Sequence, residues 1–310
     1  MSSQLHCGST SVWHIWIDTG GTFTDCIARD PVGQLHRCKV LSNGALRDRV
    51  EAIEDGRLRL SGASSLPDGF LTGVELSPLG ETTGVKILEH DASRGTVTLD
   101  GPLPASLEPG APVELLSGEE APLLGARLIT GTAYGAELPP VSMRLATTRG
   151  TNALLTRRGA RMAHFITSGF EDLLGIGGQQ RPDLFALHIE KPAPLPEVII
   201  GVHERLAADG TVVEQLDQES LGQKISELRE RGIQCASITL LHGHRNPAHE
   251  TILEGMLVEA GFDSVSRSSA ISPFQGLLRR SQTSSTDAYL GPVITDYLGA
   301  VGRGLPDEGS

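Results

Sequence analysis

Hydrophobic and polar residues alternate near the start of the chain, and this alternation predicts three short strands. Residues 14–17 alternate and end at Asp18, after which the glycine pair at 20–21 turns the chain. A second strand is expected over residues 26–28 and a third over residues 35–41. Short strands joined by tight turns are typical of an antiparallel sheet.

Residues 61–140 are dense in glycine and proline and show no helical periodicity. We expect a β-rich insert there, because short apolar runs recur along the whole segment. A disordered linker is the alternative, but a linker does not need recurring apolar residues. The strands expected in the insert cover residues 84–89, 95–99, 112–116 and 126–130.

From about residue 142 strand-like and helix-like segments alternate, which predicts βαβ units and a largely parallel sheet. Strands are expected at 143–146, 161–167 and 235–241, and a hairpin should join 197–206 to 211–214. Helical segments are expected over residues 152–158, 170–174, 218–231 and 284–301. A further helix should begin at Asn246-Pro247 and bury Ile252, Met256 and Ala260.

Composition and charge exclude several classes of protein. The formal net charge of −12 argues against non-specific binding to nucleic acid or to an anionic membrane, since both need a cationic face. No run approaches the roughly 20 apolar residues of a membrane span, and the first twelve residues do not resemble a signal peptide. The four cysteines form no C-x-x-C pair, so we expect reduced thiols in a cytoplasmic protein.

Residues 17–25 carry the strongest chemical signal. An apolar strand delivers Asp18 to a turn whose two glycines allow positive φ angles and close approach, while Thr22, Thr24 and Asp25 follow. Backbone amides and a carboxylate in this arrangement suit a phosphate with a hydrated Mg²⁺. The same residue types also fit an ordinary β-hairpin. No lysine follows a glycine, so a Walker-type P-loop is absent.

This segment, together with residues 39–42, resembles the N-terminus of the hydantoinase A/5-oxoprolinase family. Further segments resemble stretches of the same family in the same order, which is far more specific than one glycine motif. These segments are residues 146–155, 167–177, 180–185 and 241–250.

The resemblance implies an α/β fold, namely one half of an actin-like ATPase of the ribonuclease-H-like type, with the β-rich insert added. In that fold two halves clasp ATP without a P-loop, which agrees with the missing glycine–lysine pair. With Mg²⁺ assigned to the two carboxylates, the implied ATP-binding residues are Asp18, Gly20, Gly21, Thr22, Thr24 and Asp25.

The chain departs from the family pattern in its insert, in its length and at Thr19, where many relatives carry arginine. No second D-x-G-G-T motif follows residue 25. We therefore expect the chain to be the first portion of a longer enzyme and to end before its second ATPase half. The expected domains are the hairpin region with its phosphate loop at 1–60, the insert at 61–140 and an α/β continuation at 141–310.

Three residues are candidates for substrate binding. Thr148 and Asn152 stand where a helix is expected to begin, so they could face an anion or simply cap the helix. Arg181 lies in a polar loop and could hold a carboxylate bidentately, although a surface salt bridge is the alternative.

Three histidines are the other candidate ligands. His242, His244 and His249 could form a metal cluster, but no fourth ligand has a fixed spacing, which favours structural roles at a helix start. No G-x-S-x-G or H-E-x-x-H motif is present, and the sequence identifies no catalytic base.

The implied activity is ATP-dependent hydrolysis of the cyclic amide 5-oxo-L-proline to L-glutamate. The implied partners are the small cyclic amide, a hydantoinase B-like domain or subunit, and further copies in an oligomer; no nucleic acid or membrane is expected. The alternatives are an ATP-hydrolysing N-methylhydantoinase, a ketone carboxylase subunit and a non-catalytic assembly fragment.

Overall fold

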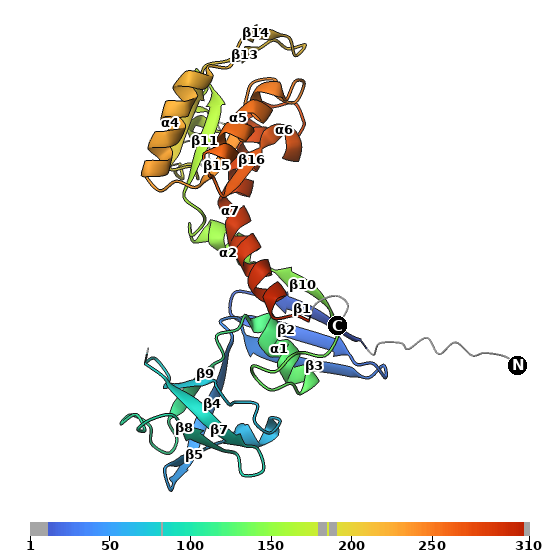
Figure 1. The fold of residues 1–310 in the computed structure, drawn as a ribbon, viewed down its shortest axis with the longest axis vertical. Coiled ribbons are helices and arrows are strands. Elements are labelled where there is room, and N and C mark those ends of the chain that lie inside the picture. The colour runs from blue at the N-terminus through green and yellow to red at the C-terminus, as the bar shows by residue number, and fades with distance from the viewer. Residues whose placement is uncertain (1–11, 82, 179–184, 186–190, 307–310) are drawn as a thin grey trace, which may run out of the picture. The chain divides into compact units, whose positions relative to one another are not determined.

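The computed structural model describes residues 12–81, 83–178, 185 and 191–306. The chain divides into two compact units (Figure 1). The first unit comprises residues 1–152 and 296–310, and the second unit comprises residues 153–295. The chain therefore leaves the first unit, builds the second and then returns.

A four-stranded sheet forms the middle of the first unit. Strands β1 (Trp13–Thr19), β2 (Phe23–Arg29) and β3 (Leu35–Leu41) are antiparallel, and β10 (Val141–Thr147) adds to β1 in parallel. Successive residues of β2 are alternately exposed and buried, as a sheet with one covered face requires. The prediction of three antiparallel strands is confirmed.

The covered face of this sheet packs against two helices, α1 (Ala121–Thr130) and the last turns of α7 (Leu277–Arg303). Ile15 and Ile17 of β1 pack in one apolar cluster with residues of α1 and with Tyr297 and Val301 of α7. These side chains make up the core of the sheet region.

The strand predicted over residues 126–130 is wrong, because these residues form the second half of α1. Leu123 and Ala126 lie three residues apart and share the buried face, which is a helical spacing. Gly131, at φ 70°, ends the helix in the left-handed conformation that glycine adopts most easily.

A closed six-stranded barrel follows the sheet and has a core of its own, so the β-rich character predicted for the insert is confirmed. Because a closed barrel has no free edges, its backbone groups are paired without help from neighbours. The first strand of the barrel starts before residue 61, where the insert was predicted to begin. The barrel order is β4 (Ala45–Glu54), β5 (Arg57–Leu60), β8 (Thr96–Leu99), β7 (Val85–Asp91), β6 (Glu75–Pro78) and β9 (Pro112–Leu116), and η1 (Ala63–Ser65) follows β5.

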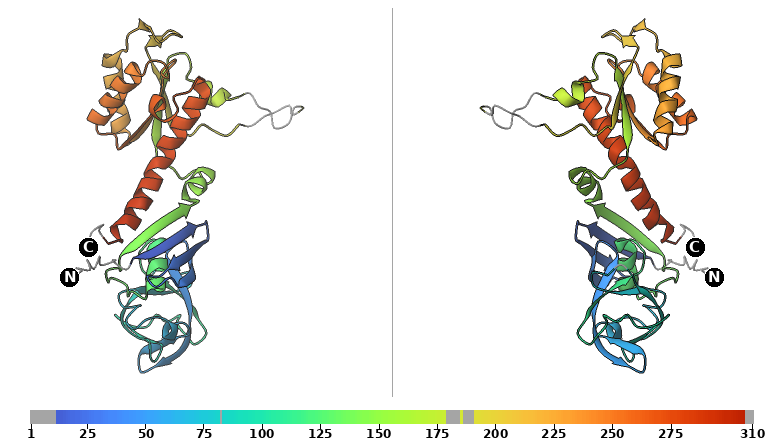
Figure 2. Two further views of the ribbon diagram at one scale, coloured as in Figure 1. Left: turned by 90° about the vertical axis from the view of Figure 1, so that its right-hand side faces the viewer. Right: turned by 90° about the vertical axis from the view of Figure 1, so that its left-hand side faces the viewer.

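The second unit contains a parallel sheet in the order β12 (Val198–Val202), β11 (Met162–Thr167), β15 (Cys235–Thr239) and β16 (Ser264–Arg267). Figure 2 shows α4 (Gln218–Glu230) and α5 (Ala248–Glu259) on one face of this sheet and α7 on the other. This confirms the predicted α/β alternation. The remaining elements are α2 (Arg149–Leu155), α3 (Leu173–Ile176), α6 (Ser268–Ile271), β13 (Arg205–Leu206) and β14 (Val212–Glu214).

The face predicted to be buried on α5 is wrong. The buried residues are His249, Glu250, Leu253 and Leu257, whereas Ile252 is 40% exposed. The true face is displaced by one residue, which is about 100° of helix rotation. The cause is a pair of polar side chains on α5 that find partners inside the unit.

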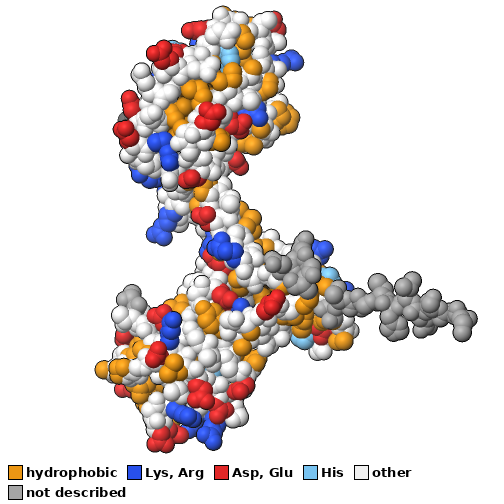
Figure 3. All heavy atoms as spheres, viewed as in Figure 1, with side chains coloured by type: hydrophobic (Ala, Val, Ile, Leu, Met, Phe, Trp, Pro, Cys, Tyr) orange, Lys and Arg blue, Asp and Glu red, His pale blue; other side chains and the backbone are white. Residues whose placement is uncertain are grey.

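Acidic and basic side chains are interspersed on the face drawn in Figure 3. The full sequence has 38 acidic and 26 basic residues. Within the described part of the chain, no helix has both the length and the apolar character needed to cross a bilayer.

Candidate functional site

The turn between β1 and β2 is fixed by hydrogen bonds on one side and open on the other. The amide of Gly20 donates to the carbonyl of Phe23 (3.0 Å), and the hydroxyl of Ser42 donates to the carbonyl of Gly20 (2.9 Å). The amide of Ser42 donates to the carbonyl of Thr22 (2.9 Å). Gly21 and Thr22 are exposed, and neither of their amides donates to a backbone carbonyl of the described residues.

The glycines keep the turn small and do not supply unusual backbone angles. We predicted positive φ angles here, but neither glycine adopts a left-handed conformation. A Cβ atom on Gly20 would lie 3.1 Å from the carbonyl oxygen of Phe23, and one on Gly21 would lie 3.4 Å from Nδ2 of Asn152. A side chain at position 20 would crowd the turn, and a side chain at position 21 would extend to Asn152.

Asp18 and Asp25 face each other across β1 and β2, and both are exposed. Asp25 forms an ion pair with Lys39 on β3, with 2.7 Å between Oδ1 and Nζ. Among the described residues, no hydrogen bond or ion pair engages the carboxylate of Asp18. The turn therefore has one paired and one unpaired carboxylate beside it.

The threonines around the turn divide into inward and outward side chains. Thr24 is fully buried, and its hydroxyl shares a hydrogen bond with that of Ser42 (3.0 Å). Thr19 is buried and shares one with the phenol of Tyr297 (3.1 Å), whose pKa is raised above its usual value by burial. Thr22 is exposed and can present its hydroxyl to a ligand.

Strand β10 brings two further predicted residues to the same turn. The amide of Thr148 donates to the carbonyl of Thr19 (2.9 Å), because β10 runs parallel to β1 and ends beside it. The side-chain amide of Asn152 donates to the hydroxyl of Thr148 (3.3 Å) and approaches Gly21. The residues predicted for ATP and two of those predicted for substrate therefore lie together. Arg181, the third substrate candidate, lies outside the described residues.

Side-chain contacts that the sequence did not indicate hold this arrangement in place. Arg149 binds both carboxylate oxygens of Glu120, at 3.0 and 3.1 Å, and its guanidinium lies 4.2 Å from the ring centre of Tyr297. Tyr297 in turn contacts Thr19, which is 278 positions earlier in the chain. No local sequence pattern indicates contacts over such separations.

In the second unit, residues from the segments that resemble the family take part in a buried polar network instead of a metal site. Glu204 is 1% exposed and accepts hydrogen bonds from the hydroxyl of Thr167 and from Nδ1 of His249 (2.8 Å). Among the described residues, no group of three or more His, Cys, Asp or Glu side chains is arranged to hold a metal ion. His249 thus has the structural role that the sequence favoured.

A buried ion pair lies next to this network. Glu250 and Arg280 are 0% and 1% exposed, with 3.3 Å between Oε1 and Nη1. Glu250 also accepts from the amide of Leu240 (2.8 Å) and the hydroxyl of Ser268 (2.7 Å), while Arg280 donates to the carbonyl of Leu240 (2.7 Å). These bonds fix the chain where it leaves β15.

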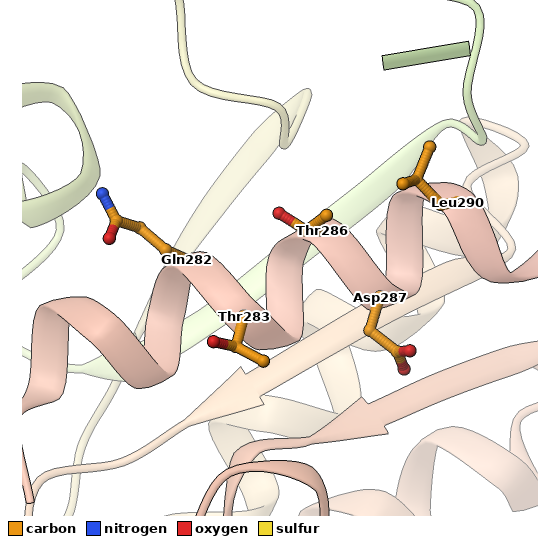
Figure 4. A pocket seen from close by; sticks show the side chains of 5 residues that line it. All are labelled: Gln282, Thr283, Thr286, Asp287 and Leu290. Atoms are coloured by element: carbon orange, nitrogen blue, oxygen red, sulfur yellow. The ribbon is translucent and has the colours of Figure 1, made fainter. Parts of the chain in front are cut away.

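A groove of about 480 Å³ runs along α7 in the second unit, and the described residues that line it belong to that helix (Figure 4). The carboxylate of Asp287 accepts a hydrogen bond from Ser266 (2.7 Å). None of the predicted site residues that the structure describes lines this groove. The lining residues are Gln282, Thr283, Thr286, Asp287 and Leu290.

Comparison with known proteins decides the family. The hydantoinase/oxoprolinase N-terminal region matches residues 14–82 and 108–261. The chain belongs to the hydantoinase/oxoprolinase family. It is 38% identical over 208 residues to 5-oxoprolinase 1 of Arabidopsis thaliana, an alignment that covers 58% of this chain and 16% of the relative. The resemblance inferred from the motifs is therefore confirmed.

Two solved structures share the fold of this hydantoinase/oxoprolinase chain. A nucleotide-free acetone carboxylase, described as ATP-dependent, has a TM-score of 0.59 at 17% identity, with 94% of this chain and 34% of that chain covered. The ATP-dependent caprolactamase of Pseudomonas jessenii has a TM-score of 0.55 at 19% identity, with 93% and 33% covered. The chain thus spans about a third of these structures and about a sixth of the Arabidopsis relative.

Proposed function

We propose that this chain is the N-terminal, ATP-binding part of a cytoplasmic 5-oxoprolinase-like enzyme that converts 5-oxo-L-proline to L-glutamate. In this proposal the chain is part of an actin-like ATPase half. The observation that carries it is the exposed turn at Gly21 and Thr22, with Asp18 and Asn152 beside it. The family membership supports it, and both fold relatives are described as ATP-dependent.

The residues of the turn fit a nucleotide phosphate with Mg²⁺. The amides of Gly21 and Thr22 and the hydroxyl of Thr22 are exposed donors for phosphate oxygens, and the side-chain amide of Asn152 lies next to them. The carboxylate of Asp18 can hold water molecules of a phosphate-bound Mg²⁺, which retains much of its hydration shell.

The other predicted residues act on the turn indirectly in this proposal. The hydroxyl of Thr24 is hydrogen-bonded to that of Ser42, which donates to the carbonyl of Gly20. The buried hydroxyl of Thr24 therefore fixes the turn and does not contact a ligand. Asp25 is paired with Lys39 and keeps a second negative charge beside Asp18. Thr148 orients Asn152.

The chemistry explains why ATP would be needed. A lactam is stabilised by resonance, and ATP when bound supplies a phosphoryl group that makes the amide carbon a better electrophile. The part of this chain is to hold and orient the transferred group, because phosphoryl transfer depends mainly on positioning and on stabilising charge. In this proposal a hydantoinase B-like domain or subunit and further copies of the chain complete the enzyme.

The test is binding of ATP with Mg²⁺ by calorimetry to the full chain and to two variants of the turn. We expect Asp18→Ala and Gly21→Val each to weaken binding by roughly tenfold or more, since each removes or blocks a charge-assisted contact of about 1.5–3 kcal/mol. Matched controls are Glu219→Ala and Gly222→Val, at an exposed position and at an open helix position of α4. Equal ATP affinity in wild type and both turn variants would refute the site.

A ketone carboxylase subunit is the second candidate, favoured by the likeness to acetone carboxylase over 94% of the chain. ATP turnover by the completed enzyme should be measured with 5-oxoproline, with N-methylhydantoin, and with acetone plus bicarbonate. Turnover with one substrate alone assigns the reaction. Tight association with a hydantoinase B-like protein without turnover on any of them would indicate an assembly role.

A further inference from the structure

Cys26 and Cys38 occupy directly opposed positions on β2 and β3 of the first unit. Directly opposed residues of an antiparallel pair have Cα atoms about 4.5–5.5 Å apart. A disulfide requires a Cα separation of about 4.4–6.8 Å. The backbone register therefore satisfies the main geometric condition for a bond between these two sulfurs, whichever kind of ladder pair they form.

Both cysteine side chains point to the covered face of the sheet and meet the same residue of α1. Sγ of Cys38 lies 3.6 Å from the carbonyl oxygen of Gly125, to which its S–H donates while the thiol is protonated. A Cβ atom on Gly125 would collide with Sγ of Cys26 and would lie 3.8 Å from Sγ of Cys38. The missing side chain of Gly125 thus leaves room for the sulfur of Cys26, and the sulfur of Cys38 lies beside the same residue.

The two thiols are unequal in exposure and in acidity. Cys26 is 1% exposed, whereas Cys38 is half-buried and closer to solvent. The hydrogen bond between the two side chains lowers the pKa of Cys38 and raises that of Cys26. Cys38 is therefore the thiol that ionises first and the one that an oxidant can reach, and a thiolate is the reactive form.

We propose that Cys26 and Cys38 form a redox-active dithiol, which hydrogen peroxide converts to a cross-strand disulfide. The Cys38 thiolate attacks one oxygen of peroxide, the O–O bond breaks, and the expelled hydroxide takes a proton to become water. The Cys26 sulfur then loses its proton and attacks the resulting Cys38 sulfenic acid, expelling hydroxide that takes that proton as a second water. Two thiols lose two electrons and one peroxide gains two.

The bond would form next to the candidate nucleotide turn but does not depend on it. Asp25 and Lys39 are the adjacent opposed pair on the same two strands. A covalent link between their neighbours fixes the spacing of β2 and β3 at this point. The modification is thus a property of the sheet, and its detection needs no assay of ATP.

The experiment is a peroxide titration of the full chain, followed by alkylation, digestion with trypsin and chymotrypsin, and mass spectrometry. We expect a peptide pair that joins Cys26 to Cys38 and disappears with dithiothreitol, while Cys235, buried on β15, stays alkylated. Aromatic cleavage sites separate Cys7 from Cys26, so the Cys26 peptide does not contain Cys7. Cys7→Ser should therefore give the same peptide pair. Independent oxidation of Cys26 and Cys38 to sulfinic acids, without this pair, would overturn the proposal.

Matched variants test the order of events. In Cys26→Ser we expect a Cys38 sulfenic acid that dimedone traps, and in Cys38→Ser we expect oxidation of Cys26 to slow at least tenfold. Phenylarsine oxide, which bridges two neighbouring thiols, should bind one per chain to wild type and to Cys235→Ser, and not to Cys26→Ser. Far-UV circular dichroism checks that each variant folds, and failure of the reduced wild type to bind the arsenical would contradict the proximity of the thiols.

Discussion

Replacing Glu250 by glutamine is expected to lower the free energy of unfolding of the second unit by about 3–5 kcal/mol. Glutamine has nearly the same shape as glutamate, so the expected loss comes from charge. Arg280 is 1% exposed, and without Glu250 its guanidinium would be a buried charge without a counterion. Burial lowers the pKa of Arg280 below its usual value. The negative charge of Glu250 and its hydrogen bond to Arg280 act in the opposite direction and raise this pKa.

Urea unfolding monitored by circular dichroism measures this loss. The matched control is Glu254→Gln, one turn further along α5, whose ion pair with Arg267 is partly exposed. We expect that variant to lose less than about 1 kcal/mol, because water screens surface pairs. Equal losses in the two variants would show that the buried pair contributes no more than a surface pair.

Stability of the second unit is also expected to fall as the pH drops from 7 to 5, by about 2 kcal/mol through His164 alone. His164 is fully buried, and burial lowers its pKa from 6.5 to about 3. Its Nδ1 lies 2.7 Å from the hydroxyl of Ser237. Between pH 6.5 and 3 the unfolded chain binds a proton at this residue and the folded chain does not, so acid favours unfolding.

The measurement is the free energy of unfolding at several pH values for wild type and for His164→Asn. Asparagine cannot take up the proton, so the variant should lose less stability between pH 7 and pH 5, whatever its stability at pH 7. His14→Asn, at an exposed position of β1, should keep the wild-type slope. A slope unchanged in His164→Asn would show that His164 is not the group responsible.

Much of the secondary structure followed from local sequence signals. The alternation in residues 14–17 and the glycine pair gave the first hairpin, and Gly232 at φ 73° ends α4 as expected. Residues 126–130 were predicted as a strand because the segment is dense in glycine and proline and shows no helical periodicity, but Gly125 lies within a helix and leaves room for the sulfur of Cys26. Local patterns do not reveal what a neighbouring strand requires.

Only the part of the candidate site that is local in sequence could be predicted. Asp18, Gly20, Gly21 and Thr22 adjoin in sequence, so their types alone suggested a phosphate turn. That Asn152 reaches the turn follows only from the parallel pairing of β1 with β10, more than a hundred residues apart. Tyr297 is further still, and nothing near it indicates Thr19 as its partner.

The return of the chain to the first unit has a consequence for how this protein is made. Ile15 and Ile17 leave the ribosome early, yet Tyr297 and Val301, which cover them, are synthesised close to 300 residues into the chain. At about 5–20 residues per second, the part of that apolar sheet face that α7 covers stays open for roughly 15–60 s, while α1 is available earlier to cover the rest. We therefore expect the nascent sheet to be completed last and to depend on chaperones until α7 arrives, although it is the first element of the chain to be made.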